Sequence, residues 1–470
     1  MKEQDAGPDE VNEEDERTDS ETPEVEEAYT PDEVLLIRLQ SALTVFANRQ
    51  SEVLRLASYV RDRSAEIDNA KARAIELIEQ RLSEVDEEAF EGFWDVFQTI
   101  ERDDLGDSSL TPEERSEAMQ SAVSELAKTL PEGAAASYLD GVVMAQYAPP
   151  GASLLLSSLL VTLVGEVELF INYLARALIE RRPDAIDAGG QKFSWTDVTQ
   201  HGSIDDFRDH VVDKTIQEVL RGSLTDWMDF LEKRFDIAAP KQSREFEATE
   251  LVQRRHVIVH NGGSASSQYL DKLKGFKHDV DPDEPLPVTH EYLTRAADNL
   301  YVIAFGLVMA AGLKHCKVDE GTHPVEQFTS NQTFYMLQEG RYELVEKIVD
   351  SVQLSRLKSD SSRLVFTVNR WIALKSLGRF AECKRQVERF ETSSRSRDHT
   401  LAKLALLGED EKAFELAQKM IRDDELKPEF LLTWPLLKDV RDYGRRLEDE
   451  AKSGVGSESS EDKENNRVQP

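Results

Sequence analysis

Cysteine is nearly absent from the sequence, and the little there is forms no pattern. The two cysteines, Cys316 and Cys383, lie far apart and match neither a metal-binding spacing nor a disulfide framework. We expect both to be reduced, partly buried thiols in a cytoplasmic protein.

Long apolar segments are also missing. No signal peptide opens the chain. The most apolar run, Gly151–Gly165, is too short to span a bilayer, and it leads directly into Glu166 and Glu168. We therefore expect this run to form a buried helix, and we expect no membrane partner.

Positive charge is scarce as well. The chain has 57 Lys and Arg against 91 Asp and Glu, which gives a net charge of −34. This acidity disfavours sequence-blind binding to nucleic acid, because phosphates would be repelled, but it does not exclude a local basic site. The acidic composition resembles that of proteins from salt-loving archaea, in which cytosolic salt screens the repulsion.

Alternation of polar and apolar residues, which is typical of strands, is nearly absent, so the pattern predicts an all-α protein. With 470 residues, of which 40% are hydrophobic, the chain is long enough for several domains. The pattern divides it into a disordered acidic tail (1–30), a helical N-terminal domain (31–150), a helical bundle (151–320), helical repeats (325–450) and a disordered tail (451–470).

Several helix starts can be recognised from their caps. Pro31 begins a long helical pattern that points to one long helix or two. Thr111 is expected to cap a second helix, with Pro112 at its first position and Glu114 completing a capping box. Nothing in this N-terminal domain suggests a chemical site.

The C-terminal third contains a weak internal repeat. Gly340, Gly378 and Gly408 each stand between two amphipathic helical patterns, on average about one tetratricopeptide unit apart. These segments resemble degenerate tetratricopeptide repeats. Such repeats stack into an α-solenoid that usually binds protein, so we expect a protein partner here.

One stretch, "LVQRRHVIVHNGGS" (251–264), combines an apolar helical pattern with four basic side chains. We expect Asn261, Gly262 and Gly263 to end the helix. Basic residues in a last turn are ordinary, because they suit the negative end of the helix dipole. A capped helix end is therefore one interpretation, and a phosphate-handling site is the other.

The residue types in this stretch suit cleavage of an RNA phosphodiester. That reaction needs a base for the 2′-hydroxyl proton, a cation for the developing charge and an acid for the leaving 5′-oxygen. Histidine can serve in either proton transfer, and arginine is a forked donor matched to phosphate oxygens. Arg255 and His260 are about one and a half helical turns apart, so the long arginine side chain can converge with the imidazole.

The stretch resembles the motif of the HEPN superfamily (higher eukaryotes and prokaryotes nucleotide-binding), which is Arg, a polar residue, three further residues and His. Here these positions are Arg255, His256, 257–259 and His260. Arg254 fits a longer permitted spacing. The resemblance extends over about residues 153–315, and Glu168 before Phe170 matches an acidic position of the family's opening helix.

The resemblance implies a helical bundle, pairing of two such domains, and a metal-independent endoribonuclease without cofactor, acting as a toxin or defence effector. Arg255 and His260 are then catalytic, and His256, Glu168 and Arg254 support them. RNA is the substrate, and a homodimer forms through the HEPN-like domain. Some family members have lost catalysis, so the alternative is a non-catalytic interaction or nucleotide-binding scaffold.

Other histidines and tryptophans are weaker candidates. No other histidine has a partner at metal-ligand spacing, so we expect solvated or capping roles for His201, His210, His278, His290, His315 and His323. Trp195, Trp227 and Trp371 are expected in the core rather than as base-stacking platforms.

Overall fold

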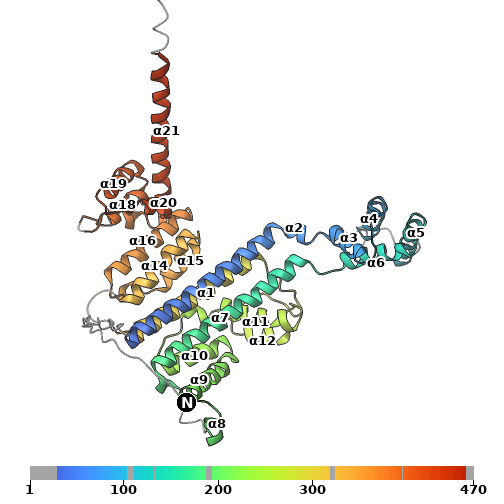
Figure 1. Ribbon diagram of the computed structural model, residues 1–470, viewed down its shortest axis with the longest axis horizontal. Helices are drawn as coiled ribbons and strands as arrows, with labels where there is room; N and C mark the ends of the chain where they lie inside the picture. Colours follow the sequence, from blue (N-terminus) through green and yellow to red (C-terminus); the bar gives the residue numbers. More distant parts are fainter. Residues whose placement is uncertain are drawn as a thin grey trace, which may run out of the picture.

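The computed structural model describes residues 29–102, 111–131, 133–186, 193–317, 323–393 and 395–461, and in these ranges it confirms an all-α protein without strands. The ribbon forms a central body of long helices with an arm at one side and a stack of short helices at the other (Figure 1). The helices are α1 (Pro31–Asp62), α2 (Ser64–Ile67), α3 (Ala70–Glu79), α4 (Glu87–Arg102), α5 (Pro112–Thr129), α6 (Ala134–Gln146), α7 (Gly151–Arg181), α8 (Trp195–Thr199), α9 (Ile204–Leu220), α10 (Leu224–Phe235), α11 (Phe246–His260), α12 (Ser267–Leu273), α13 (His290–His315), α14 (Pro324–Gln338), α15 (Tyr342–Ser351), α16 (Asp360–Ser376), α17 (Lys384–Arg389), α18 (Arg397–Leu407), α19 (Asp410–Arg422), α20 (Pro428–Thr433) and α21 (Lys438–Glu461).

The central body is built on α1, α7 and α13. Helices α1 and α7 lie side by side along the diagonal of Figure 1, and α13 packs on both. Large side chains such as Phe46, Phe170 and Tyr301 fill the space between the three helices. The first helix begins as predicted, because Thr30 and Glu33 form a capping box ahead of Pro31. The capping box of Thr111 and Glu114 is also present.

The packing divides residues 31–150 differently from the sequence-based division. Helix α1 belongs to the same hydrophobic core as α7 and α13, whereas α3 to α6 form an arm with a separate core around Phe90, Phe97 and Tyr138. The arm therefore extends from the ends of α1 and α7 (Figure 1). The reason is that the apolar face of α1 finds its partner more than one hundred residues later in the chain, which a local pattern does not reveal.

Helix α7 is less buried than the sequence suggests. It runs 31 residues, well past Gly165, and only 33% of its most apolar 18-residue window is buried. The corresponding window of α13 is 78% buried. By length and composition alone, both helices could cross a membrane. The expected burial of Gly151–Gly165 is thus only partly right, since Leu154 and Leu155 are exposed.

The C-terminal third is a stack of helical hairpins. The pairs α14–α15, α16–α17 and α18–α19 each turn near one of the three predicted glycines. Gly340, Gly378 and Gly408 have φ of 74°, 73° and 75°, the left-handed region that side chains with a Cβ rarely adopt. Successive pairs contact one another. Helix α15 of the first pair packs on α16 of the second pair, and α16 also packs on α18 of the third pair.

The last helix reaches into the segment predicted as a disordered tail. Helix α21 continues to Glu461, beyond the expected boundary at residue 451. Residues 451–469 contain no proline, the residue that most strongly interrupts a helix. The rest of this tail, and the acidic tail up to residue 28, lie outside the described residues.

Both cysteines are free and buried, as expected. Burial raises the pKa of Cys316 to about 11, and it also raises the pKa of Cys383. Neither thiol is therefore an activated nucleophile at neutral pH.

A buried ion pair joins the hairpin stack to the central body. Arg341, at the start of α15, donates from Nη2 to Asp298 of α13 at 2.8 Å and to the side-chain oxygen of Gln50 of α1 at 2.8 Å. Gln50 in turn donates to the carbonyl of Ala297 at 2.7 Å. The Arg341 and Asp298 side chains are 11% and 8% exposed, so the buried guanidinium depends on Asp298 for compensation, while Asp298 has a second, longer contact to Lys347 at 3.8 Å.

We expect Asp298→Ala to lower the free energy of unfolding by about 3–5 kcal/mol, because it leaves the Arg341 guanidinium buried without its carboxylate. Asp205→Ala, which removes an exposed partner of Arg208, should cost less than about 1 kcal/mol. Urea unfolding followed by circular dichroism measures both. Equal effects would show that the buried pair does not hold the two parts together.

Candidate functional site

The motif residues occupy the last turns of α11, which packs on α7, α12 and α13. His260 is the final helical residue, as predicted. Asn261 and Gly263 both donate their backbone N–H to the carbonyl of Val257, at 2.8 and 3.0 Å, and this closes the helix. Val257 is buried in a small separate core with Tyr269 and Leu273. The end of α11 is therefore firmly anchored.

Arg254 is held in a buried polar network that the sequence analysis missed. Its Nε donates to Glu250 at 2.6 Å, its Nη1 donates to the carbonyl of Pro287 at 2.8 Å, and its guanidinium lies 4.1 Å from the centre of the Tyr292 ring. Tyr269 and Tyr292 donate their hydroxyls to the two oxygens of Glu250, at 2.8 and 2.6 Å. In the sequence, the four-residue spacing of Glu250 and Arg254 indicates this ion pair, because residues four apart lie on the same face of a helix.

This network leaves Arg254 with a positioning role. Its side chain is 13% exposed and that of Glu250 is 6% exposed, and their charges compensate each other. A phosphate would have to displace these contacts in order to bind Arg254. The expected support from Arg254 is therefore indirect, since it fixes α11 against α13.

Arg255 lies one residue further along the helix and points toward α7. Its Nη2 is 3.8 Å from the carboxylate of Glu168, and the two side chains are 34% and 37% exposed. The Nε of Arg255 is buried and has no hydrogen-bond partner. The structure thus brings Arg255 and Glu168 together, and it leaves the guanidinium with donors to spare.

The two motif histidines lie against each other. The ring centres of His256 and His260 are 4.7 Å apart, at an interplanar angle of 49°. His260 is exposed and His256 is half-buried. The end of α11 therefore presents two imidazoles and one incompletely bonded guanidinium on the same short segment.

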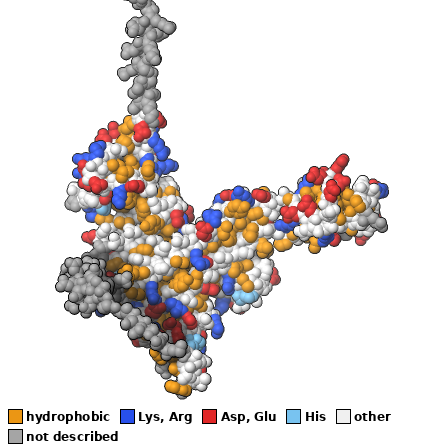
Figure 2. All heavy atoms as spheres, viewed as in Figure 1, with side chains coloured by type: hydrophobic (Ala, Val, Ile, Leu, Met, Phe, Trp, Pro, Cys, Tyr) orange, Lys and Arg blue, Asp and Glu red, His pale blue; other side chains and the backbone are white. Residues whose placement is uncertain are grey.

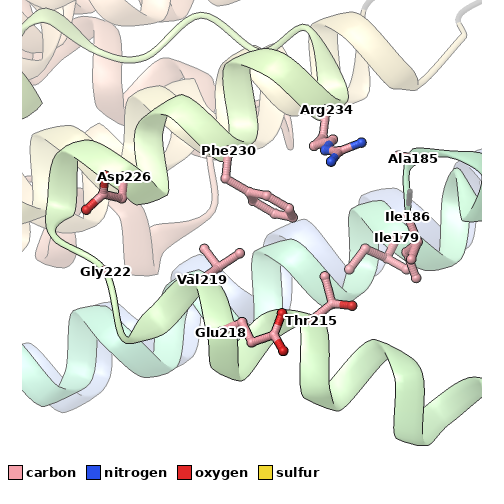
Figure 3. Close-up of a pocket in the computed structure, with 10 residues that line it drawn as sticks. All are labelled: Ile179, Ala185, Ile186, Thr215, Glu218, Val219, Gly222, Asp226, Phe230 and Arg234. Atoms are coloured by element: carbon pink, nitrogen blue, oxygen red, sulfur yellow. The ribbon is translucent and has the colours of Figure 1, made fainter. Parts of the chain in front are cut away.

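Two cavities in the described residues involve α11 itself or helices that pack on it, and neither is lined by these groups. One, of about 430 Å³, lies between α7, α9 and α10, where Phe230 faces Val219 (Figure 3). Ile179, on its α7 side, is eleven residues from Glu168, which is roughly 16 Å along a helix. The other, of about 610 Å³, touches the motif helix only at its beginning, up to Glu250. The motif residues thus lie outside both cavities, at the surface of the protein, where His260 is exposed.

The remaining histidines behave largely as expected. His323 caps α14 by accepting from the backbone N–H of Val325, and His315 bonds the carbonyl of Phe235 at 2.8 Å. His201 and His210 form a second histidine pair, with ring centres 4.8 Å apart. Among the described residues, no group of His, Cys, Asp or Glu is placed to hold a metal ion.

Of the three tryptophans predicted to lie in the core, two do so and one does not. Trp227 and Trp371 are buried, as predicted. Trp195 is 81% exposed, so its predicted core position is wrong. It stands at the first position of the short helix α8, which has no buried residue of its own.

No family model, no curated protein and no solved structure matches the chain. Its function therefore has to be argued from the residues of the site.

The Glu250 network predicts how stability depends on pH. Burial, and then the negative charge of Glu250, raise the pKa of Tyr269 and Tyr292 above their ordinary value near 10. Folding thus favours the protonated phenols. Their contribution to stability is complete below pH 10 and is lost as the pH rises from there toward the raised pKa values.

We expect Tyr292→Phe to be less stable than the natural protein at pH 7, by about 1–3 kcal/mol, because a buried carboxylate oxygen loses its donor. Above pH 10, the stability of the variant should fall less steeply than that of the natural protein. Thermal unfolding at a series of pH values measures this difference. Tyr335→Phe, at an exposed side chain, is the control. Parallel pH curves for the natural protein and Tyr292→Phe would contradict the argument.

Proposed function

We propose that this protein is a metal-independent endoribonuclease of the HEPN type. The observation that carries the proposal is the composition of the surface at the end of α11. There the terminal nitrogens of Arg255 make only a long ion pair, at 3.8 Å, to Glu168, and His260 is exposed beside His256. A phosphate is the ligand that these donors suit.

In the proposed reaction, Arg255 binds the scissile phosphate and His260 carries out proton transfer. The 2′-oxygen loses its proton and attacks phosphorus, the bond from phosphorus to the 5′-oxygen breaks, and that oxygen receives a proton. The products are a 2′,3′-cyclic phosphate and a 5′-hydroxyl. His256 orients His260 through ring contact, and Glu168 orients Arg255.

The surrounding architecture fits this proposal. Helices α7, α11 and α13 form the HEPN-like bundle, and the hairpins α14–α19 form a tetratricopeptide-like solenoid that binds a protein partner. The protein acts in the cytoplasm as a toxin or defence effector. On the alternative hypothesis, the motif binds a nucleotide without cleaving RNA, and the hairpins make the protein a scaffold.

RNA incubated with the purified protein and a chelator should be cleaved to 2′,3′-cyclic phosphate ends. His260→Ala should lower the rate by a factor of about 10²–10⁴, because a proton-transfer group is lost. Arg255→Ala should lower it by a similar factor, because charge stabilisation is lost. End-group analysis of labelled RNA by gel electrophoresis gives both values.

His210→Ala is a matched control, since it breaks the other pair of adjacent histidines, which lies outside the motif. It should cleave RNA at the natural rate. If the natural protein and His260→Ala cleave equally, the assignment of His260 is wrong. If the natural protein binds RNA or nucleotides and cleaves neither, the scaffold hypothesis holds.

A second copy of the chain would complete the site. One turn of α11 offers too few groups for base, acid and charge stabilisation together, and it lies at the surface of the protein. Beside it, α7 exposes a stripe with Leu154, Leu155 and Tyr173, and hydrophobic side chains reach the surface along the diagonal of α1 and α7 (Figure 2). Val259 adds an exposed apolar side chain on α11 itself.

The stripe is suited to a two-fold contact. Its central positions, Ser158, Thr162 and Gly165, are small, which allows a second helix to approach closely. A two-fold interface uses the same face twice, so two copies of Arg255 and His260 would share one cleft. Their combined positive charge offsets the acidic exterior around the RNA.

We expect light scattering of the full chain to give twice its mass of 53.2 kDa. Leu154→Glu combined with Leu155→Glu should give a monomer with little RNase activity, whereas Ile204→Glu, at an exposed residue of α9, should change neither. Mixing Arg255→Ala chains with His260→Ala chains should leave activity low, since each shared cleft lacks one group of each kind. A fully active monomer would refute the shared cleft.

A further inference from the structure

One part of this acidic chain is basic. Residues 354–403 hold twelve Lys and Arg and five Asp and Glu, whereas the whole chain has a net charge of −34. These residues form α16, α17 and the start of α18, in the middle of the hairpin stack. Figure 2 shows Lys and Arg side chains around this end of the molecule, interspersed with Asp and Glu. The local charge is thus opposite in sign to the net charge of the chain.

The centre of this region is helix α17. Lys384, Arg385 and Arg389 are exposed there, and none of the three has a carboxylate within ion-pair distance among the described residues. Arg385 and Arg389 are four residues apart, so they lie on one face of the helix. By contrast, Arg379, just before α17, is fully engaged by Glu346 and Glu382. The three α17 side chains are available to an external anion.

An aromatic ring extends this surface. Phe390, directly after Arg389, is half-buried, and the guanidinium of Arg395 lies 5.6 Å from the centre of its ring. Lys403 donates to the carbonyl of Phe390 at 2.8 Å, which brings another ammonium group to the same place. Three acidic residues, Glu388, Glu391 and Asp398, occur in the same segment, 384–403, and are outnumbered by its six Lys and Arg. We call Lys384, Arg385, Arg389, Phe390, Arg395 and Lys403 the α17 surface.

We propose that the α17 surface is a second RNA-binding site, which holds the phosphate backbone of the substrate away from the place of cleavage. This inference rests on the endoribonuclease function proposed above. Arginine side chains without intramolecular partners suit phosphates. The Phe390 ring already contacts Trp371 and His399, so the flat group that can stack on an unpaired base is the exposed guanidinium of Arg395 above that ring. The ring and guanidinium favour single-stranded RNA over an acidic polypeptide, which would need only the charges.

The two sites are far enough apart to act separately. Helix α11 packs on α7, α12 and α13, whereas α17 packs on α18 and on the short turn η5 (Phe380–Glu382). Contacts lead from α11 through α13, α15 and α16 to η5. Four packing contacts thus separate the two sites, and at about 8–10 Å for each step the path between them is roughly 30–40 Å long. A dinucleotide is too short to reach both, and a longer strand can reach both.

The test compares two full-length triple variants, each made in the His260→Ala protein so that the RNA stays intact. Lys384→Glu, Arg385→Glu and Arg389→Glu alter the α17 surface. Lys419→Glu, Arg422→Glu and Lys427→Glu alter three exposed residues of the next hairpin by the same total charge. Fluorescence anisotropy with a single-stranded RNA of about 20 nucleotides, longer than the usual 4–16-nucleotide site, gives the Kd at several salt concentrations.

We expect the α17 variant to bind RNA at least tenfold more weakly. Its plot of log K against log salt should be less steep by about 2, since about 0.7 is lost for each phosphate contact on a single strand. The control variant should stay within about twofold of the parent. Equal losses in both variants would mean that net charge alone matters, and unchanged binding in the α17 variant would mean that this surface holds an acidic protein or nothing. Either result overturns the inference.

Cleavage assays separate this inference from the proposed function. With His260 present, the α17 variant should show a raised KM on the long RNA, an unchanged kcat, and natural activity on a dinucleotide. If the natural protein cleaves no RNA, the proposed function fails, while the anisotropy result still decides whether the α17 surface binds RNA. If the variant loses activity on the dinucleotide as well, the surface is not a separate site. Matching thermal unfolding of the two triple variants checks that both are folded.

Discussion

The carboxylate of Glu250 is the group on which the geometry of the candidate site depends. It is nearly inaccessible to water, and it accepts hydrogen bonds from Arg254, Tyr269 and Tyr292. A buried charge of this kind is tolerable only when its lone pairs are satisfied, so the four groups hold one another in place. Through them α11 is fixed against α13 and against the segment that follows the motif.

That constraint also separates the roles of the two adjacent arginines. Because neighbouring residues on a helix point about 100° apart, locking Arg254 toward α13 directs Arg255 toward α7 and Glu168. One guanidinium becomes part of the interior, and the other stays partly exposed, with only a long ion pair to Glu168. A substitution at Glu250 would therefore alter the site without touching either histidine.

Charge gives the molecule its second organising feature. The chain has a net charge of −34, so the RNA binding proposed above needs places where basic side chains gather locally. The end of α11 and the α17 surface are two such places, on different layers of helices. An acidic exterior with separated basic sites favours binding at those sites over binding elsewhere, because the repulsion suppresses non-specific contacts.

Much of the local structure could be predicted from the sequence. The caps at Thr30 and Thr111, the glycine turns of the three hairpins and the end of α11 at His260 follow from short-range rules of backbone geometry and hydrogen bonding. The predicted neighbours of the motif also meet, since Glu168 lies beside Arg255 and His256 beside His260. The exposed position of Trp195 could not be foreseen, because burial depends on which element packs against a helix.

The sequence by itself determined that this is a helical protein, where several of its helices begin or end, and that one helix end gathers two arginines and two histidines. Only the tertiary structure decided that α1 shares a core with α7 and α13, that α7 keeps an exposed stripe, and that Arg254 is buried while Arg255 is not. The physical reason is the distance along the chain over which each interaction acts. Helix caps and turns act within a few residues, whereas the partners of α1, Glu250 and Arg341 are contributed by segments far away in the chain.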